Sequence, residues 1–408
     1  MIKKGFFILL SMMLVIAILI GCTRTDSKQT SSAPAKNTSG DSKTVKIGII
    51  GARTGASATL GQYLDGAIAA FNKINDAGGI NGYKFEVIVR DDEANPTKAK
   101  ELVKDLLYKE GVSAIIGPTN TSNALAMLPE VFKAKVPLID PVATGSKIGE
   151  EAKKLAKGDK NYFFRTTTPD YTQADAIAGY LKAKGIQKPV ILHDETAYGK
   201  GGLKEIQAAL DKAGVKPVKE VGFPMSTSDL TPQVMEAKQA QADALVVWAL
   251  GHDQAQIAKA KQKLGFTVPM VGSTAMQQTN FRELAGDAAN GNISIWPSNH
   301  VRAQKEGKLS QRITDAYEVY KKYFPKGYSL EDAGSLMFAY DAAMIVASAV
   351  EKAGNDPAGI RDAMESLPHK NIASKDLLQY SADNHEAWES KDIGMVKIED
   401  NKIYQLNE

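Results

Sequence analysis

Short apolar strands alternate with helical segments along most of the chain, and this alternation limits the possible folds more than any other feature. Residues 45–50 and 85–90 have the character of strands, and each is followed by apolar residues at helical spacing. The same rhythm continues through strands at 114–116 and 137–140. A strand–helix–strand order requires right-handed crossovers, so the sequence predicts an α/β fold with a parallel sheet.

The rhythm starts again after residue 162, which indicates a second lobe rather than one long sheet. A strand at 162–165 precedes a helix, and a new series of strands follows. The predicted strands of this series are 190–193, 218–223, 244–248, 270–271 and 293–296. The remaining predicted elements are long helices at 309–324 and 333–353 and a hairpin of 393–398 with 403–406. We therefore expect two doubly wound parallel-sheet lobes.

The N-terminus has the pattern of a secretory signal that ends in a lipidation site. Lys3 and Lys4 precede an apolar run at 6–20, and the run ends in Leu19-Ile20-Gly21-Cys22. This ending resembles the bacterial lipobox, whose cysteine is acylated and becomes the mature N-terminus. A retained signal anchor is the alternative, but the run falls short of the roughly 20 residues that a spanning helix needs. We expect residues 1–21 to be a signal peptide and Cys22 to carry the lipid.

Residues 22–43 are predicted to form a flexible tether between this lipid and the globular body. From Thr23 to Lys43 the chain has no large apolar residue and is rich in Ser, Thr, Lys and Ala, so it cannot bury enough surface to fold. The expected location is secreted and extracytoplasmic, with a lipid anchor in the cell membrane.

Composition argues against several other classes of protein. The 50 Lys and Arg nearly balance the 47 Asp and Glu, giving a net charge of +3, and no basic cluster suggests nucleic acid as a partner. The single cysteine excludes an internal disulfide and a cysteine-built metal site. The 5 histidines lie far apart in the sequence, so we expect no metal site and no cofactor.

Signals for catalysis are weak. Gly199-Lys200 resembles part of a phosphate-binding loop, but Gly201 stands where Ser or Thr would reach magnesium. There is no G-x-S-x-G nucleophile motif. His193-Asp194-Glu195 at a strand end has the residue types of acid–base machinery, but a solvated edge between strand and loop is the favoured interpretation. We expect a binding protein rather than an enzyme.

A set of ordered motifs resembles a known family. These are Gly51-Ala52-Arg53-Thr54-Gly55, Gly78-Gly79-Ile80-Asn81-Gly82, Arg90-Asp91-Asp92, Ile116-Gly117-Pro118, Asp140-Pro141-Val142-Ala143-Thr144 and Phe164-Arg165-Thr166. In this order they resemble the leucine/isoleucine/valine-binding family of solute-binding proteins for ABC importers, which has the type I periplasmic-binding fold.

The resemblance implies a Venus-flytrap architecture of two lobes joined by a multi-strand hinge. One lobe would comprise 44–168 and about 298–378, and the other 169–297 and about 379–408. The ligand would lie between them, where the carboxyl ends of the strands face each other, in agreement with the general rule for open α/β sheets. It also implies a monomer that serves ABC permease and ATPase subunits.

The segment Gly117 to Ser122 has the features of an anion site. It ends a strand and opens a helix, so free backbone N–H groups, the helix dipole and the hydroxyls of Thr121 and Ser122 converge on a group the size of a carboxylate. The alternative role for Thr121 or Ser122 is simple helix capping, which uses the same geometry.

Other site residues follow from the resemblance. The Ala143-Thr144 turn would contact the ligand's carboxylate and amine together with Thr121, and Tyr198 would close over the ligand from the facing lobe. Leu60 and Trp248 are candidates for apolar recognition, with a core position as the alternative for each. The complete predicted ligand-binding set is Leu60, Thr121, Ser122, Val142, Ala143, Thr144, Asp170, Tyr198, Gly251 and Thr274.

One position departs from the family pattern. Amino-acid-binding members place an acidic residue after the strand that here precedes Thr274, where it neutralises the ligand's ammonium. A buried ammonium without a partner costs several kcal/mol, so either Asp170 supplies the charge or the ligand lacks an amine. Asp170 matches a cleft-edge acid of the family, and a helix N-cap is its alternative role.

The sequence therefore predicts a lipoprotein that captures a branched-chain-type amino acid or a related small carboxylate by lobe closure and delivers it to a permease. A ligand-sensing receptor subunit is the competing interpretation. A secreted hydrolase using the same cleft is a third, which the missing nucleophile motif disfavours.

Overall fold

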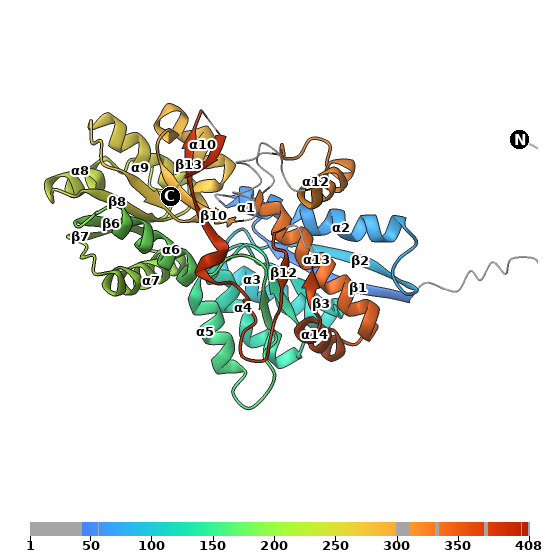
Figure 1. Cartoon of the computed structure of the whole chain (residues 1–408). Helices are drawn as coiled ribbons and strands as arrows, with labels where there is room; N and C mark the ends of the chain where they lie inside the picture. The colour runs from blue at the N-terminus through green and yellow to red at the C-terminus, as the bar shows by residue number, and fades with distance from the viewer. Residues whose placement is uncertain are drawn as a thin grey trace, which may run out of the picture. The chain divides into compact units, whose positions relative to one another are not determined.

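The computed structural model describes residues 43–55, 57–298, 311–330, 334–370, 374–400 and 402–406 (Figure 1). The predicted signal peptide, Cys22 and nearly all of the tether lie outside these residues. The description below concerns the globular body.

The first lobe is built on a fully parallel sheet with strand order β2-β1-β3-β4-β5. Its strands are β1 (Lys43–Gly51), β2 (Tyr83–Asp91), β3 (Ala114–Ile116), β4 (Leu138–Asp140) and β5 (Phe163–Arg165). The central strands are buried along their whole length because helices cover both faces. One face packs on the helices α1 (Ala58–Tyr63), α2 (Asp65–Asp76), α12 (Gln311–Tyr323), α13 (Gly334–Ala353) and α14 (Pro357–Ser366). The other face packs on α3 (Pro96–Asp105), α4 (Thr121–Ala134) and α5 (Ser146–Leu155).

The second lobe is built on a mixed sheet with strand order β14-β13-β10-β9-β8-β6-β7. Its parallel strands are β6 (Pro189–Asp194), β7 (Lys219–Phe223), β8 (Ala244–Trp248), β9 (Met270–Gly272) and β10 (Ile293–Pro297). The helices of this lobe are α6 (Asp170–Ala183), α7 (Ala197–Ala213), α8 (Thr231–Gln239), α9 (Gly251–Lys263) and α10 (Thr279–Ala285). In Figure 1 these helices group around the second sheet.

The C-terminal strands join the second sheet in the antiparallel sense. Strand β13 (Ile393–Glu399) pairs with β10 on one side and with β14 (Lys402–Gln405) on the other, as the predicted hairpin requires. A further small pair, β11 (His369–Lys370) with β12 (Leu377–Leu378), lies outside both main sheets. The two-lobed α/β fold expected from the sequence is therefore confirmed.

Local structure differs from the expected elements in two places. The helical segment expected after the first strand is divided into α1 and α2, because the Leu64 amide bonds to the Gly61 carbonyl and α2 begins only at Asp65. Helix α3 continues into a π-helical turn, η1 (Leu106–Glu110), which ends at Gly111 in a left-handed conformation. Neither feature has a periodicity signal in the sequence.

Helix α13 is the central helix of the first lobe. Among the described residues it is the helix that is long and apolar enough to cross a membrane by length and composition alone. In the structure 72% of its most apolar stretch is buried inside the protein, against α2 and α14. Its apolar composition is accounted for by this packing.

Candidate functional site

A cavity of about 190 Å³ lies where the carboxyl ends of the parallel strands of the two sheets face each other. Strand order reverses between β1 and β3 in the first sheet and between β6 and β8 in the second. Loops and helices that follow these four strands supply Leu60, Thr121, Tyr198 and Leu250 to the cavity wall. Ligands of open α/β sheets bind at such switch points, so the cavity has the position expected of a binding site.

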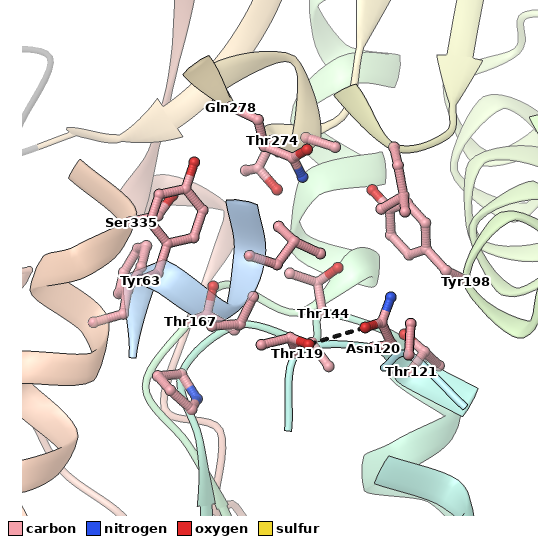
Figure 2. Close-up of a pocket in the computed structure, with 18 of the residues that line it drawn as sticks. Tyr63, Thr119, Asn120, Thr121, Thr144, Thr167, Tyr198, Thr274, Gln278 and Ser335 are labelled. Carbon is pink, nitrogen blue, oxygen red and sulfur yellow. Dashed lines mark hydrogen bonds between the residues drawn. The ribbon is translucent and has the colours of Figure 1, made fainter. Parts of the chain in front are cut away.

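The N-terminus of α4 forms one end of this cavity (Figure 2). Its N-cap residue is Asn120, whose side chain does not cap the helix but accepts a 2.9 Å hydrogen bond from Thr119 Oγ1 and donates to Ser57 at 3.3 Å. Thr121 and Ser122 are the first helical residues, so the capping alternative is wrong for both. Free N–H groups and hydroxyls at the positive end of a 14-residue helix suit an anionic group.

A glycine allows the strand before α4 to reach this position. Gly117 has φ of +123°, and a Cβ there would lie 2.0 Å from the Ile50 carbonyl oxygen of the neighbouring strand. Only glycine tolerates both the conformation and the close backbone approach.

The loop from Pro141 to Thr144 forms the adjoining wall and is held from behind by charged groups. Asp140 accepts hydrogen bonds from the Val142 and Ala143 amides at 3.0 and 2.8 Å. The fully buried Arg165 donates to the carbonyls of Thr144 and Gly145 at 3.1 and 2.9 Å. Each of these bonds goes to the main chain of the loop, so Asp140 and Arg165 hold its backbone in place.

Arg165 also forms a 2.6 Å ion pair with Glu386, which comes from the C-terminal part of the chain. Two further carboxyl groups lie nearby, and burial raises the pKa of each, Asp140 and Asp170, to about 7. The positive charge of Arg165 opposes this rise in both cases, and the Thr144 hydroxyl opposes it at Asp170. The cluster therefore combines the Arg165–Glu386 ion pair with two buried carboxyl groups whose pKa is raised to about 7.

The second lobe supplies the facing wall with Tyr198 and Thr274 (Figure 2). The Tyr198 hydroxyl forms a 2.7 Å hydrogen bond with Ser273, and burial raises its pKa well above the usual value. Thr274 forms hydrogen bonds with the buried Gln173 through both its amide and its hydroxyl, at 3.1 and 3.2 Å. The Thr196 hydroxyl caps α7 by accepting from the Tyr198 and Gly199 amides, which fixes Tyr198 at the start of that helix.

Gln278 lies beside Thr274 in the same wall, and sequence reasoning missed it (Figure 2). Its side-chain carbonyl accepts a 3.1 Å hydrogen bond from the Gly251 amide. A Cβ on Gly251 would lie 2.8 Å from this oxygen and 2.4 Å from Asn280 Oδ1. Gly251 is therefore the support of Gln278 rather than a lining residue.

Aromatic and aliphatic side chains line the rest of the cavity. Trp296 on β10 and Phe338 on α13 meet edge to face with ring centroids 6.1 Å apart, and Tyr63 lies close to Ser335. Burial raises the pKa of Tyr63 to about 12. The sequence analysis did not identify Tyr63, Trp296 or Phe338, because each reads as an ordinary core position in a strand or helix.

The predicted ligand-binding residues divide into two groups. The cavity is lined by Leu60, Thr121, Ser122, Val142, Ala143, Thr144, Tyr198 and Thr274. Asp170 and Gly251 do not line it: Asp170 is fully buried behind Thr144, and Gly251 lies behind Gln278. Trp248 is also fully buried, against Gly202, and belongs to the core.

The described part of the cavity wall is uncharged. None of the lining residues that the structure describes is Asp, Glu, Lys, Arg or His. Across the described ranges, no group of acidic, histidine or cysteine side chains is arranged to hold a metal ion. Asp194, from the motif considered for acid–base chemistry, accepts a bond from the Thr196 amide and so supports the cap of α7.

The fold and the cavity between its lobes define a two-lobed binding protein, and known structures agree. The periplasmic binding protein type 1 from Bordetella pertussis gives a TM-score of 0.79 at 26% identity, covering 90% of this chain and 100% of that protein. The substrate-binding protein of a branched-chain amino acid transporter from Streptococcus pneumoniae, in complex with isoleucine, gives a TM-score of 0.76 at 24% identity, covering 88% and 98%. The fold is that of the type I periplasmic binding proteins.

Sequence comparison leads to the family. The sequence model described as "Periplasmic binding protein" matches residues 44–402. The leucine-, isoleucine-, valine-, threonine- and alanine-binding protein of Pseudomonas aeruginosa is 25% identical over 326 residues, which are 79% of this chain and 82% of that protein. The chain belongs to the periplasmic binding protein family, in the type I group that includes the Leu/Ile/Val-binding proteins. These relatives are named as binding proteins rather than enzymes.

Proposed function

We propose that this protein is the extracytoplasmic solute-binding component of an ABC importer, and that it captures a small carboxylate by closing its lobes. The observation that carries the proposal is the cavity itself, which joins the free N-terminus of α4 on one lobe to Tyr198 and Thr274 on the other. The lobes comprise 44–168 with about 298–378, and 169–297 with about 379–408. The protein acts as a monomer and delivers its ligand to permease and ATPase subunits without covalent chemistry.

Closure of the two lobes on a ligand follows from the fact that both lobes supply residues to the cavity wall. A ligand that contacts Thr121 and Thr144 on the first lobe and Tyr198 on the second gains full binding energy only when the lobes are together. Contacts between the lobes already exist beside the cavity, since Tyr63 meets Thr279 and Lys204 pairs with Glu150 at 3.2 Å. These contacts support a closed state that the ligand selects.

The ligand is of branched-chain amino-acid size or a related carboxylate. The small volume of the cavity suits such a solute, since drug-sized ligands occupy pockets of about 300–1,000 Å³. The names of the relatives favour amino acids. The uncharged lining favours a carboxylate without an ammonium group, because that cation would be desolvated with no acidic partner among the described residues of the wall.

The central experiment combines calorimetric titration with small-angle scattering. A ligand that bridges the lobes should stabilise the protein by about 2.7 kcal/mol at a hundredfold excess over Kd and should make the particle more compact. Binding without compaction would contradict the closure mechanism.

Thr274 provides the test of the ligand's charge. We expect the wild type to bind the keto acid of leucine, or benzoate, more tightly than leucine. Thr274→Glu should reverse this order, because a carboxylate there pairs with an ammonium and repels a ligand that has only negative charge. Tight leucine binding by the wild type that is lost in Asp170→Ala would instead mean that Asp170 supplies the counter-charge.

The lipid anchor is part of the same proposal. A lipid on Cys22 and a tether over residues 22–43 would hold the binding protein at the outer face of the cell membrane, within reach of its permease. The lipobox ending Leu19-Ile20-Gly21-Cys22 supports this.

A further inference from the structure

Two neighbouring side chains of the second-lobe wall have their hydrogen-bonding capacity fixed by buried partners. Gln278 and Thr274 lie one turn apart, at the end and the start of the 3-10 helix η2 (Thr274–Gln277), and side by side in Figure 2. Both line the cavity. Their free donors and acceptors therefore decide which chemical group a ligand can place against this part of the wall.

Gln278 presents a donor. Its side-chain oxygen accepts from the Gly251 amide, and a backbone N–H can only donate, so the orientation of the Gln278 amide group is determined. The Nε2 group has no partner in the described part of the chain. Gln278 is only 7% exposed and lines the cavity, so this amide N–H group is available to donate a hydrogen bond to an acceptor on the ligand.

Thr274 presents an acceptor. Gln173 Nε2 donates to the Thr168 carbonyl at 2.9 Å, which directs Gln173 Oε1 towards Thr274. That oxygen accepts from both the amide and the hydroxyl of Thr274. Thr274 has thereby used both of its protons, and only the lone pairs of its hydroxyl oxygen remain for a ligand.

A hydroxyl group satisfies both requirements at a single atom. It accepts a hydrogen bond from Gln278 and donates one to Thr274. A keto oxygen can accept from Gln278 but has no proton for Thr274. An ammonium can donate to Thr274 but has no lone pair to accept a hydrogen bond from Gln278. Building on the proposed function, we infer that the ligand is a hydroxy acid, whose carboxylate lies at the N-terminus of α4 and whose hydroxyl lies between Gln278 and Thr274.

The test is calorimetric titration of the full chain with two matched series of acids. One has the leucine skeleton: 2-hydroxy-4-methylpentanoate, 2-oxo-4-methylpentanoate, 4-methylpentanoate and leucine. The other has the phenylalanine skeleton with the same substituents. In whichever skeleton binds, the hydroxy acid should be the tightest ligand, ahead of the keto acid by about tenfold, the contribution of one further hydrogen bond.

Two variants separate the contributions of the two side chains. Thr274→Val should weaken binding of the hydroxy acid and leave binding of the keto acid unchanged, because the keto oxygen has no proton to donate to Thr274. Gln278→Met should lower the affinity for the hydroxy acid and the keto acid towards that for the unsubstituted acid. Gln262→Met, an exposed position on α9 of the same lobe, is the matched control and should change nothing. Thermal unfolding of each variant checks that it is folded.

The outcomes distinguish this inference from the proposed function. If a keto or amino acid is the tightest ligand of the skeleton that binds, or if Thr274→Val weakens hydroxy and keto acids equally, the hydroxyl assignment is wrong while the carboxylate-binding function stands. If the wild type binds none of these acids, the carboxylate-binding function is wrong and the hydroxyl assignment falls with it.

Discussion

Arg165→Met should be among the most damaging single substitutions in the protein. The Arg165 side chain is fully buried and pairs with Glu386 at 2.6 Å while donating to the carbonyls of Thr144 and Gly145. Methionine fills a similar volume but supplies neither charge nor donors. The substitution therefore leaves a buried carboxylate without its cation, while the Thr144 and Gly145 carbonyls keep hydrogen bonds from the Asp170 and Ile148 amides.

The size of the effect follows from these contacts. Removing one partner of a buried ion pair costs about 3–5 kcal/mol. Domains of this kind have a total stability of roughly 5–15 kcal/mol, so a loss of about 4 kcal/mol is a large fraction of it.

Arg90→Met is the matched control. Arg90 also meets two carboxylates, Asp105 at 3.0 Å and Glu110 at 2.6 Å, but its side chain is 26% exposed on the surface of the first lobe. Surface ion pairs contribute about 0–1 kcal/mol, so the free energy of unfolding of this variant should be close to that of the wild type.

Urea denaturation at neutral pH, followed by circular dichroism, measures both variants. If the free energies of unfolding of Arg165→Met and Arg90→Met differ by less than about 1 kcal/mol, the account of Arg165 as the support of the cavity wall is refuted.

The remaining predictions concern the anchor and the buried acids. Cys22→Ala should release the protein from membranes or leave it unprocessed; cleavage before residue 22 with wild-type membrane fractionation would exclude the lipid anchor. The pKa of Asp170 lies at about 7 in the folded protein, above its usual value of 3.8, so folding favours the protonated acid. Its contribution to stability is complete below pH 4 and is lost as the pH rises towards 7, and Asp140 acts in the same direction. Asp170→Asn should therefore make the free energy of unfolding less dependent on pH between 5 and 8, and an unchanged slope would contradict the shift.

The cavity residues that the sequence could predict are those that follow strands directly. Thr121, Thr144 and Tyr198 lie within five residues after the ends of β3, β4 and β6, where the rule that ligands bind at the carboxyl edge of the sheet applies. The prediction of Thr121 rests on its own strand–helix pattern, whereas the predictions of Thr144 and Tyr198 rest on the family resemblance. The fold could be predicted because strand and helix periodicity continue through both lobes.

The cavity residues that the sequence could not predict depend on tertiary placement. Phe338 lies on a helix about 170 positions beyond Thr166, and yet its carbonyl accepts from that threonine hydroxyl at the junction of the lobes. Trp296 is an apolar residue in a buried strand, and no pattern distinguishes its cavity-facing position from a core position. Gly251 lies behind the cavity wall rather than in it. A glycine at the start of a helix indicates that another group approaches the backbone closely, but the sequence does not show that this group is Gln278.

The placement of charge explains why the wall can be neutral and still organised. Arg165 and Glu386 neutralise each other behind the Thr144 loop, and burial keeps Asp140 and Asp170 partly protonated near neutral pH. The cluster therefore fixes the loop without projecting a strong field into the cavity. The positive end of α4 is then the feature to which the proposed function assigns the ligand's carboxylate. On the other lobe, Gln278 and Thr274 distinguish ligands by hydrogen-bond direction alone, which gives selectivity among acids of the same charge and similar size.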